Sequence, residues 1–168
     1  NGISLVRKVL FKEWAGKFDP FDVPEGFDRE VVYEALEPTK IYVKSFLNTA
    51  KQVNVKGDIH ITGDAYVKFD RFMKFSKGIG FEFNNFKPQP IFDLIQKTAP
   101  EVGGEITDEE MLKTFNMGWG FAVIVDKTEV DDTIAVIEKN DVEADQIGTI
   151  TDTGRIIAHY KNKKLLLK

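Results

Sequence analysis

The sequence predicts an α+β fold with mixed α/β character, in which a mixed β-sheet is covered by helices. Segments with helical periodicity alternate with short β-rich segments over most of the chain, and three β-rich segments follow one another at its end. The alternating part predicts βα units, and the closing part predicts antiparallel pairing. With 168 residues, 42% of them hydrophobic, and no internal repeat or linker, residues 1–168 are interpreted as a single domain.

The first predicted helix starts at Ser4, which is suited to the N-cap position, and ends just before Gly16. Residues 17–28 contain two prolines and a glycine, so we expect a structured loop there. A short helical turn is expected at residues 29–36. The apolar face of the first helix is predicted to consist of Leu5, Val6, Val9, Leu10 and Trp14.

The middle of the chain alternates between helix and strand signals. Thr39 is expected to cap a helix over residues 39–51, although the β-branched residues there leave a strand open as the alternative. Pro90 suits a helix start, and the Thr107 to Glu110 spacing is that of a capping box. The remaining middle elements are predicted as strands over 54–62 and 78–84 and helices over 63–75, 90–99 and 107–115.

The C-terminal part is expected to supply most of the sheet. Residues 117–126 are almost continuously apolar, which is typical of a strand buried on both faces. Residues 128–140 predict an amphipathic helix. Three strands follow, and residues 152–154 are expected to form a hairpin turn between the first two; the strands are predicted over 143–152, 154–161 and 163–168.

Composition excludes several classes of function. The net charge is −4 and the sequence pI is about 5.3, which argues against charge-driven binding to nucleic acid or to acidic membranes. No apolar run is long enough for a membrane span. The absence of cysteine excludes disulfides, a thiolate nucleophile and a zinc–sulfur site.

One candidate site lies where a predicted strand ends in His60-Ile61-Thr62-Gly63. If Ile59 and Ile61 face the core, His60 faces away from it. Backbone N–H groups at Thr62 and Gly63, ahead of a helix, favour binding of a phosphate or carboxylate. Asp64 opposes anion binding there, because its own negative charge already lies next to these N–H groups. In the alternative interpretation Thr62 or Asp64 only caps the helix, and His60 is a structural histidine.

A second candidate lies around Trp119, which two glycines flank. Glycine in a strand marks a bulge or a close backbone approach, and Asn116 just before it is suited to present its amide to a ligand. The alternative is tight packing around Trp119. Asn1-Gly2 ahead of Ser4 is a similar turn. The residues show no catalytic triad, metal-ligand cluster or glycine-rich phosphate loop, and we assign no role to His159.

Four segments together resemble the C-terminal domain of aminoimidazole ribonucleotide synthetase, also called phosphoribosylformylglycinamidine cyclo-ligase. The His-Ile-Thr-Gly segment is one of them, and the order and spacing of all four match along nearly the whole chain. The other three are NGISLVRKVL at residues 1–10, LEPTKIYVKSFL at 36–47 and EEMLKTFNMGWGFAVIV at 109–125.

The resemblance implies a cytoplasmic enzyme of purine synthesis that uses ATP and Mg²⁺ to close formylglycinamidine ribonucleotide into aminoimidazole ribonucleotide. It further implies a homodimer at full length, with an N-terminal domain, absent from this chain, that supplies most of the ATP site. His60 is then expected to be catalytic, in a cleft whose wall Met117 backs. The substrate-binding residues implied are Asn1, Gly2, Ser4, Thr62, Gly63, Asp64, Asn116 and Gly118.

Two departures from the family pattern leave alternatives open. Asp64-Ala65 stands where the family usually continues with two glycines, and the chain alone should lack most of the ATP site. We expect the piece to be inactive alone and mostly monomeric. The alternatives are a non-catalytic ligand- or partner-binding domain of this fold and a superfamily relative such as formylglycinamidine ribonucleotide synthetase, selenophosphate synthetase or thiamine-monophosphate kinase.

Overall fold

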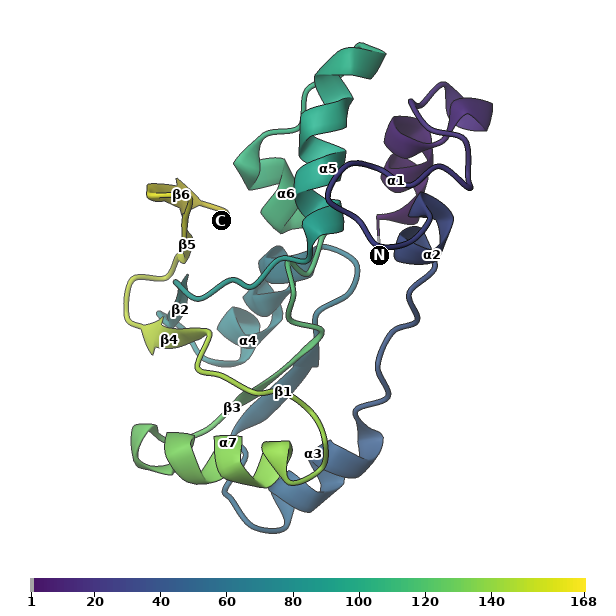
Figure 1. The fold of residues 1–168 in the computed structure, drawn as a ribbon. Helices are drawn as coiled ribbons and strands as arrows, with labels where there is room; N and C mark the ends of the chain where they lie inside the picture. Colours follow the sequence, from purple (N-terminus) through teal and green to yellow (C-terminus); the bar gives the residue numbers. More distant parts are fainter. Residues whose placement is uncertain (1) are drawn as a thin grey trace.

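The computed structural model describes residues 2–168 and consists of two small sheets with helices at both ends (Figure 1). The strands are β1 Gly57–His60, β2 Gly80–Phe83, β3 Phe121–Ile124, β4 Gly148–Thr151, β5 Ile156–Tyr160 and β6 Lys163–Leu166. The α-helices are α1 Ile3–Leu10, α2 Val31–Ala35, α3 Val43–Ala50, α4 Asp70–Phe75, α5 Pro90–Thr98, α6 Asp108–Thr114 and α7 Val130–Glu138. The 3₁₀ turns are η1 Lys12–Trp14, η2 Ala65–Phe69, η3 Ala99–Val102 and η4 Lys127–Glu129.

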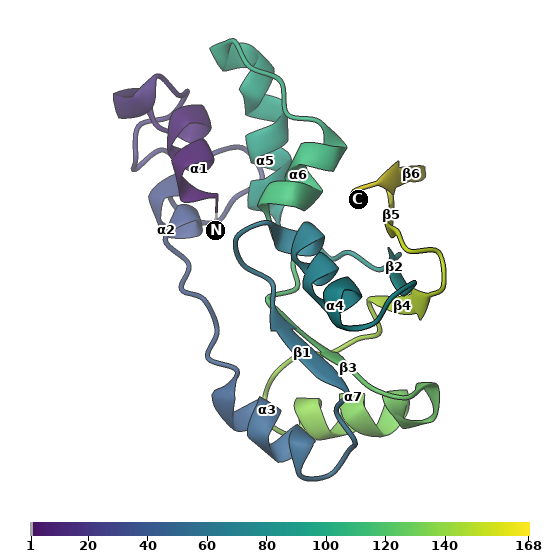
Figure 2. The same ribbon diagram turned by 180° about the vertical axis from the view of Figure 1, so that it is seen from behind.

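The helices fall into two groups that lie at opposite ends of the molecule. Helices α1, α2, α5 and α6 form one end, and α3 packs against α7 at the other, with β1 and β3 lying next to that pair (Figures 1 and 2). The chain that joins α2 to α3 runs along the outer edge in both views. The candidate site therefore lies between the two ends, where the strands pass from one group of helices to the other.

The predicted α+β class is confirmed, but the single expected sheet is divided into two. Strands β1 and β3 form an antiparallel pair in which His60 is opposite Phe121. The other sheet has the order β4-β2-β5-β6, with β2 parallel to β5 and the remaining pairs antiparallel. Because β3 belongs to a sheet of two strands, it is only half-buried, and the prediction of burial on both faces is wrong.

The predicted hairpin at residues 152–154 is also wrong, because β2 lies between β4 and β5. Phe81 and Phe83 of β2 are 3% exposed, so β2 is suited to the sheet centre, whereas Ile150 of β4 is 46% exposed and lies on an edge strand. The tight hairpin is instead the β5–β6 connection. Lys161 and Asn162 there both have positive φ, 48° and 60°, as a two-residue hairpin loop of type I′ requires.

The first helix differs from its prediction at both ends. Gly2, with φ of 71°, occupies the N-cap position, so Ser4 lies inside the first turn and does not cap it. The helix ends at Leu10, because Phe11 is extended and pairs with Phe18. A Cβ on Gly16 would lie 2.4 Å from the Phe11 nitrogen, so this glycine permits the chain to fold back there. Val6, Val9 and Leu10 are buried as predicted, whereas Trp14 is 52% exposed.

Most of the other elements form where the sequence predicts them. The loop over residues 17–28, the short helix α2, the strands β1 and β2 and the helices α5, α6 and α7 are confirmed. Pro90 opens α5, and Thr107 and Glu110 make the predicted capping box at α6. Helix α3 starts only at Val43, so Thr39 does not cap it. The helix predicted over residues 63–75 divides into η2 and α4.

The core is centred on aromatic side chains from η2 and β2. The Tyr66 and Phe69 rings each pack edge-on to the Phe83 ring, with centroids 4.9 and 4.8 Å apart. Tyr66 is fully buried, and its hydroxyl donates a 2.8 Å hydrogen bond to the Asn116 carbonyl. Burial raises the pKa of Tyr66, so this hydroxyl stays protonated. The core therefore fixes η2, which follows His60, against the segment that contains Asn116.

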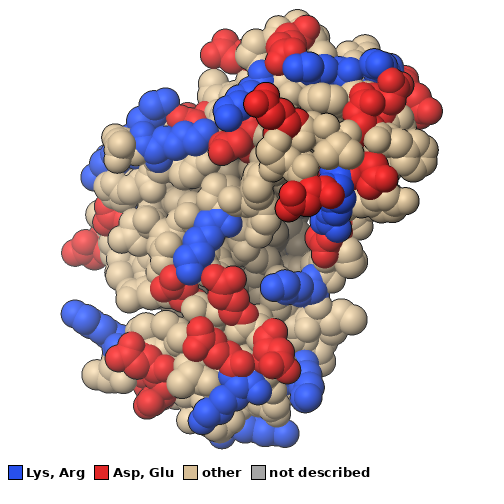
Figure 3. Space-filling model, viewed as in Figure 1, with Lys and Arg blue, Asp and Glu red and all other residues tan. Residues whose placement is uncertain are grey.

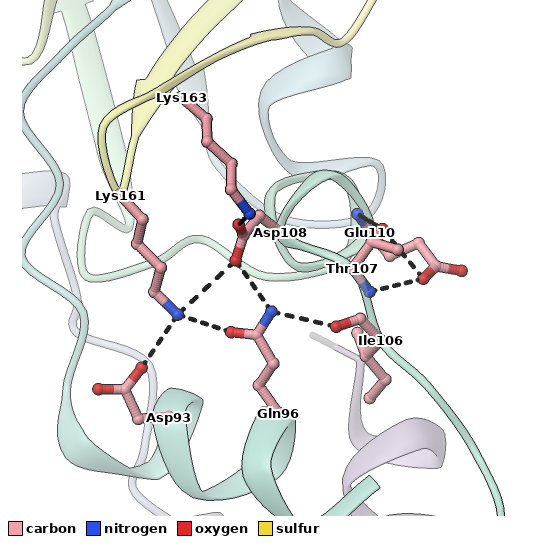
Figure 4. Close-up of polar contacts among 8 residues, drawn as sticks. All are labelled: Asp93, Gln96, Ile106, Thr107, Asp108, Glu110, Lys161 and Lys163. Atoms are coloured by element: carbon pink, nitrogen blue, oxygen red, sulfur yellow. Dashed lines mark hydrogen bonds and ion pairs between the residues drawn. The ribbon is translucent and has the colours of Figure 1, made fainter. Parts of the chain in front are cut away.

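A polar network joins the β5–β6 hairpin to helices α5 and α6 (Figure 4). The side chain of Asp108, at the start of α6, is 9% exposed and accepts hydrogen bonds from Lys163 at 2.7 Å and Gln96 at 3.0 Å. Lys161 Nζ lies 3.7 Å from the same carboxylate and 3.4 Å from Asp93. Burial opposes ionisation of Asp108, but these hydrogen bonds and lysine charges outweigh it, and its pKa falls below the ordinary 3.8.

We expect Asp108→Asn to lower the free energy of unfolding by about 1 kcal/mol at pH 7, because it removes a charge that is buried and paired. A lowered folded-state pKa stabilises the native state above the unfolded-state value of 3.8, and that stabilisation is lost as the pH falls through the lower folded value. Urea unfolding between pH 7 and pH 3 measures both effects. The deficit of Asp108→Asn should shrink below about pH 4.

The control is Asp28→Asn, an exposed aspartate that makes no hydrogen bond or ion pair within residues 2–168. It should leave stability unchanged within about 0.5 kcal/mol at every pH. A deficit of Asp108→Asn that stays constant down to pH 3 would show that the carboxylate charge is not what stabilises the hairpin.

Candidate functional site

Segments that are far apart in the sequence meet around the end of β1. Gly2 lies against the end of α6, where a Cβ on Gly2 would be 2.4 Å from Cε1 of Phe115. The Tyr42 ring stacks on Phe121 with centroids 5.4 Å apart and lies edge-on to His60 at 5.7 Å. The Ile61 N–H donates a 2.9 Å hydrogen bond to the Gly120 carbonyl. These contacts join the segments at residues 1–10, 36–47, 60–63 and 109–125.

His60 faces away from the core, as the alternation predicted. Ile59 and Ile61 on either side are 9% and 2% exposed, whereas His60 is exposed. His60 is therefore not a core residue, although its ring touches the rings of Tyr42 and Phe121. The imidazole packs against two aromatic rings and remains exposed, so it is accessible to a ligand.

Gly120 allows Tyr42 to reach this position. A Cβ on Gly120 would lie 2.1 Å from the Tyr42 hydroxyl oxygen and 3.0 Å from Cζ. Only a residue without a side chain leaves room for the ring at that place in the chain. Tyr42 was not among the sequence-predicted site residues, because its neighbours in the sequence give no sign that it crosses to β1 and β3. The glycine pair around Trp119 was the available signal.

Two residues of the turn after β1 have backbone φ angles typical of glycine, although neither is a glycine. Asp64 and Ala65 have φ of 66° and 41°, a region that residues with a Cβ rarely adopt. The turn is closed by a 2.7 Å hydrogen bond from the Ala65 N–H to the Thr62 carbonyl. Neither the Thr62 nor the Asp64 side chain caps η2, so the capping interpretation of both is wrong. Within residues 2–168 the exposed N–H groups of Gly63 and Asp64 have no acceptor, which leaves them available to an anion.

Lys68 is a site residue that the sequence analysis missed. Its Nζ donates a 3.0 Å hydrogen bond to the His60 carbonyl and another to the Thr62 hydroxyl, and so it holds the turn against the end of β1. Burial lowers the pKa of Lys68, and the charge of Arg71 lowers it further against the opposing charge of Asp64. The sequence spacing between His60 and Lys68 does not indicate their contact, because the intervening left-handed turn and 3₁₀ helix follow no single helix or strand period.

The structure confirms the predicted close backbone approach next to Trp119. Gly118 has φ of 106°, and a Cβ there would lie 2.1 Å from the Lys87 carbonyl oxygen. Asn116 Oδ1 accepts a 3.2 Å hydrogen bond from the Gly118 N–H, and its Nδ2 has no acceptor within residues 2–168. Tight packing is present too, since Trp119 is 8% exposed and donates to the Asn85 carbonyl. Met117 is fully buried, so it backs the site without reaching its surface.

Two hollows adjoin these residues. The larger, of about 1100 Å³, lies between the two groups of helices and is lined by Tyr42, Asn116 and Gly118 among others. The smaller, of about 360 Å³, is lined by His60, Lys68 and Arg71 together with Asp58, Ile59, Phe72 and Phe75. Tyr42 lines the first and touches His60, which lines the second. Acidic and basic side chains are interspersed on the face that Figure 3 shows.

The predicted site residues are therefore brought into one region but not into one hollow. Asn116 and Gly118 line the large hollow, and His60 lines the small one. The turn residues Thr62, Gly63 and Asp64 follow shortly after His60, and Gly2 and Ser4 lie at the start of α1, where Gly2 packs against the end of α6. Asn1 lies outside the described residues.

Within residues 2–168, no group of three or more histidine, aspartate or glutamate side chains is placed to hold a metal ion. None of the described helices is long and apolar enough to cross a membrane.

Asp64→Gly is expected to raise the free energy of unfolding by about 0.5–1 kcal/mol, because glycine adopts the positive φ without a steric penalty and no side-chain cap is lost. It should also lower the pKa of Lys68 further, since Asp64 is the charge that raises it. Urea unfolding measures the first effect. Asp141→Gly, at a φ of 58° outside the turn that follows β1, is the matched control and should give a similar gain. A loss of stability confined to Asp64→Gly would reveal a role for this carboxylate in holding the turn.

Comparison with known proteins assigns the family. Residues 1–161 match the family model of the AIR synthase related protein, C-terminal domain. The chain belongs to this family. The resemblance found in the sequence and the α+β fold expected from it are thereby confirmed.

Curated relatives agree with this assignment. The chain is 38% identical over 181 aligned residues to the phosphoribosylformylglycinamidine cyclo-ligase of Methanococcus maripaludis strain C5, with all of this chain and 48% of the relative covered. The cyclo-ligase of Myxococcus xanthus is 38% identical over 152 residues, covering 89% of this chain and 42% of the relative. That of Methanopyrus kandleri is 32% identical over 168 residues, covering 99% and 45%. This AIR synthase family chain thus spans about half the length of the curated relatives that it matches.

Proposed function

We propose that the chain acts as the C-terminal half of a phosphoribosylformylglycinamidine cyclo-ligase, which closes formylglycinamidine ribonucleotide into aminoimidazole ribonucleotide in purine synthesis. The observation that carries the proposal is the contact of four sequence-distant segments with one another, three of them at His60 and the fourth through Phe115. Tyr42 touches His60 and Phe121, Gly120 accommodates Tyr42, and Gly2 lies against Phe115. The same four segments carry the resemblance to this enzyme, and the curated relatives bear its name.

The proposed chemistry needs positioned polar groups more than it needs a reactive side chain. Phosphorylation of the formyl amide oxygen makes it a leaving group, after which an amidine nitrogen attacks the carbon and phosphate departs. The attacking nitrogen must lose a proton, and an exposed imidazole held by Tyr42 and Phe121 is suited to accept it. We assign this role of general base to His60.

The remaining candidate residues are suited to hold the substrate. The available N–H groups of Gly63 and Asp64 favour an anionic or carbonyl oxygen, and Thr62, whose hydroxyl is engaged with the His60 carbonyl and Lys68, supports this turn. The Nδ2 group of Asn116 is a donor on the wall of the large hollow. Gly2, Ser4 and Gly118 then shape the cleft edge with their backbone, and we extend this proposal to Asn1.

The other components of the reaction belong, in this proposal, to the rest of the enzyme. ATP and Mg²⁺ would be bound mainly by an N-terminal half, and we derive no step from the metal here. The full-length protein would act as a cytoplasmic homodimer. The ribonucleotide is then the ligand that this chain shares with that N-terminal half.

Titration of the chain with aminoimidazole ribonucleotide tests the site, because two histidines give two resolvable imidazole NMR signals. The His60 signal should shift in a saturable way, whereas the signal of His159, which pairs with Glu82 on the other sheet, should not. Inorganic phosphate at the same concentration is the control for charge alone. If both histidine signals stay fixed while the fold is intact, the site is assigned wrongly.

The same titration separates the alternative functions. A saturable shift with another nucleotide but not with the ribonucleotide would favour a superfamily relative, such as thiamine-monophosphate kinase. The Asp64-Ala65 sequence is what favours the other alternative, a non-catalytic binding domain, because it keeps the turn while adding a negative charge. Binding of the ribonucleotide together with no turnover in a full-length enzyme would support that alternative.

A further inference from the structure

The connection from α2 to α3, residues 36–43 and hereafter the linking segment, is the most exposed apolar stretch next to the site. Leu36, Ile41 and Val43 are 66%, 85% and 63% exposed. Large aliphatic side chains this exposed and this close together are typical of interaction surfaces. The segment runs along the outer edge of the molecule in both ribbon views (Figures 1 and 2).

The backbone of the linking segment is unpaired as well. Residues 37–42 have no regular secondary structure, and within residues 2–168 no backbone N–H or carbonyl group of residues 37–41 makes a hydrogen bond. Residues 36–41 are all exposed. An extended segment with free donors and acceptors is suited to pair with a strand from a partner, and the exposed aliphatic side chains then give that pairing its specificity.

The linking segment is continuous with the candidate site. Its residue Tyr42 lies between the exposed stretch and His60, and Glu37, Pro38, Thr39 and Lys40 line the large hollow. Whatever covers the segment from outside therefore lies at the rim of that hollow. A partner bound there would enclose the site rather than sit at a distance from it.

We propose that the linking segment is the surface on which the N-terminal half of the longer enzyme docks. An extended strand of that half pairs along residues 37–41 and covers Leu36, Ile41 and Val43. The chain spans 48% of the Methanococcus maripaludis relative and matches a C-terminal domain family, so about half of that relative has no counterpart here. The inference rests on the proposed function for the identity of the partner, but not for the surface.

The test uses a fusion protein in which residues 1–168 replace the matching half of the Methanococcus maripaludis cyclo-ligase. Amide hydrogen exchange at Thr39, Lys40 and Ile41 should slow at least tenfold in the fusion relative to the 168-residue chain alone. Amides of α5 serve as the internal reference for folding of this half. The same comparison with the two halves co-produced as separate chains covers the case in which the fusion itself misfolds.

Two matched variants locate the contact. Ile41→Asp should return the exchange of residues 39–41 in the fusion to the rate of the chain alone. Leu166→Asp is the control, because Leu166 is also an exposed aliphatic residue, at 54%, but lies on β6 at the opposite edge. It should leave the protection unchanged.

The outcomes separate this inference from the proposed function. Unchanged exchange at residues 39–41, with α5 amides protected as usual, overturns the docking surface even if the fusion turns over substrate. Protection that appears in the chain alone and rises with its concentration overturns it in favour of a second copy. Protection that Ile41→Asp abolishes, in a fusion without cyclo-ligase activity, supports the docking surface and contradicts the proposed function.

Discussion

Gly118→Ala is expected to lower the free energy of unfolding by about 3–4 kcal/mol, the largest stability effect of any substitution proposed for this chain. A Cβ at position 118 would lie 2.1 Å from the Lys87 carbonyl oxygen, and backbone atoms cannot move aside as the end of a side chain can. The φ of 106° adds a penalty for any residue with a Cβ. Denaturant unfolding of the purified variant measures the loss.

Gly78→Ala separates the two causes. Gly78 has φ of 86°, but a Cβ there would meet nothing within 4 Å, so only the conformational penalty of about 1 kcal/mol applies. The difference between the variants, about 2–3 kcal/mol, then measures the close approach of the chain near Lys87 to the segment that contains Asn116. Equal losses in the two variants would show that the two segments are not in contact.

His60→Ala should lower the kcat/KM of the fusion protein by about a hundredfold, the lower end of the range for a general acid–base group. Its free energy of unfolding should change by less than about 0.5 kcal/mol, because His60 is exposed and its ring contacts within residues 2–168 are limited to Tyr42 and Phe121. Steady-state kinetics and urea unfolding of the same preparation give both numbers.

His159→Ala is the matched control, since it removes the only other histidine of the chain. His159 lies on β5 and pairs with Glu82, outside both hollows, so its loss should leave kcat/KM unchanged. If His60→Ala and His159→Ala lower activity equally, or if His60→Ala acts only by unfolding the protein, His60 does not have the part assigned to it.

Local signals predicted the elements whose causes are local. Pro90 at a helix start and the Thr107–Glu110 capping box form as expected, because a fixed φ and a reciprocal pair of hydrogen bonds involve only neighbouring residues. The alternation around His60 predicted its direction for the same reason. The glycines around Trp119 indicated a bulge or a close backbone approach, with tight packing as the alternative, and the sequence could not say that Lys87 is the partner of Gly118.

Pairings between distant segments could not be predicted. The residues at 152–154 have the composition of a hairpin turn, yet β2 inserts between β4 and β5, because its apolar Phe81 and Phe83 bury best at the sheet centre. Lys68 and Tyr42 contact His60 only in the folded structure, in which η2 and the linking segment position them. No pattern within either segment indicates that contact.

Turnover by the fusion protein tests the central claim most directly. We expect the fusion to convert formylglycinamidine ribonucleotide into aminoimidazole ribonucleotide with ATP, while the 168-residue chain alone does not. Release of one phosphate for each ring closed is the expected stoichiometry. A fusion that folds and binds the ribonucleotide yet forms no aminoimidazole ribonucleotide would contradict the claim that this chain supplies half of a cyclo-ligase.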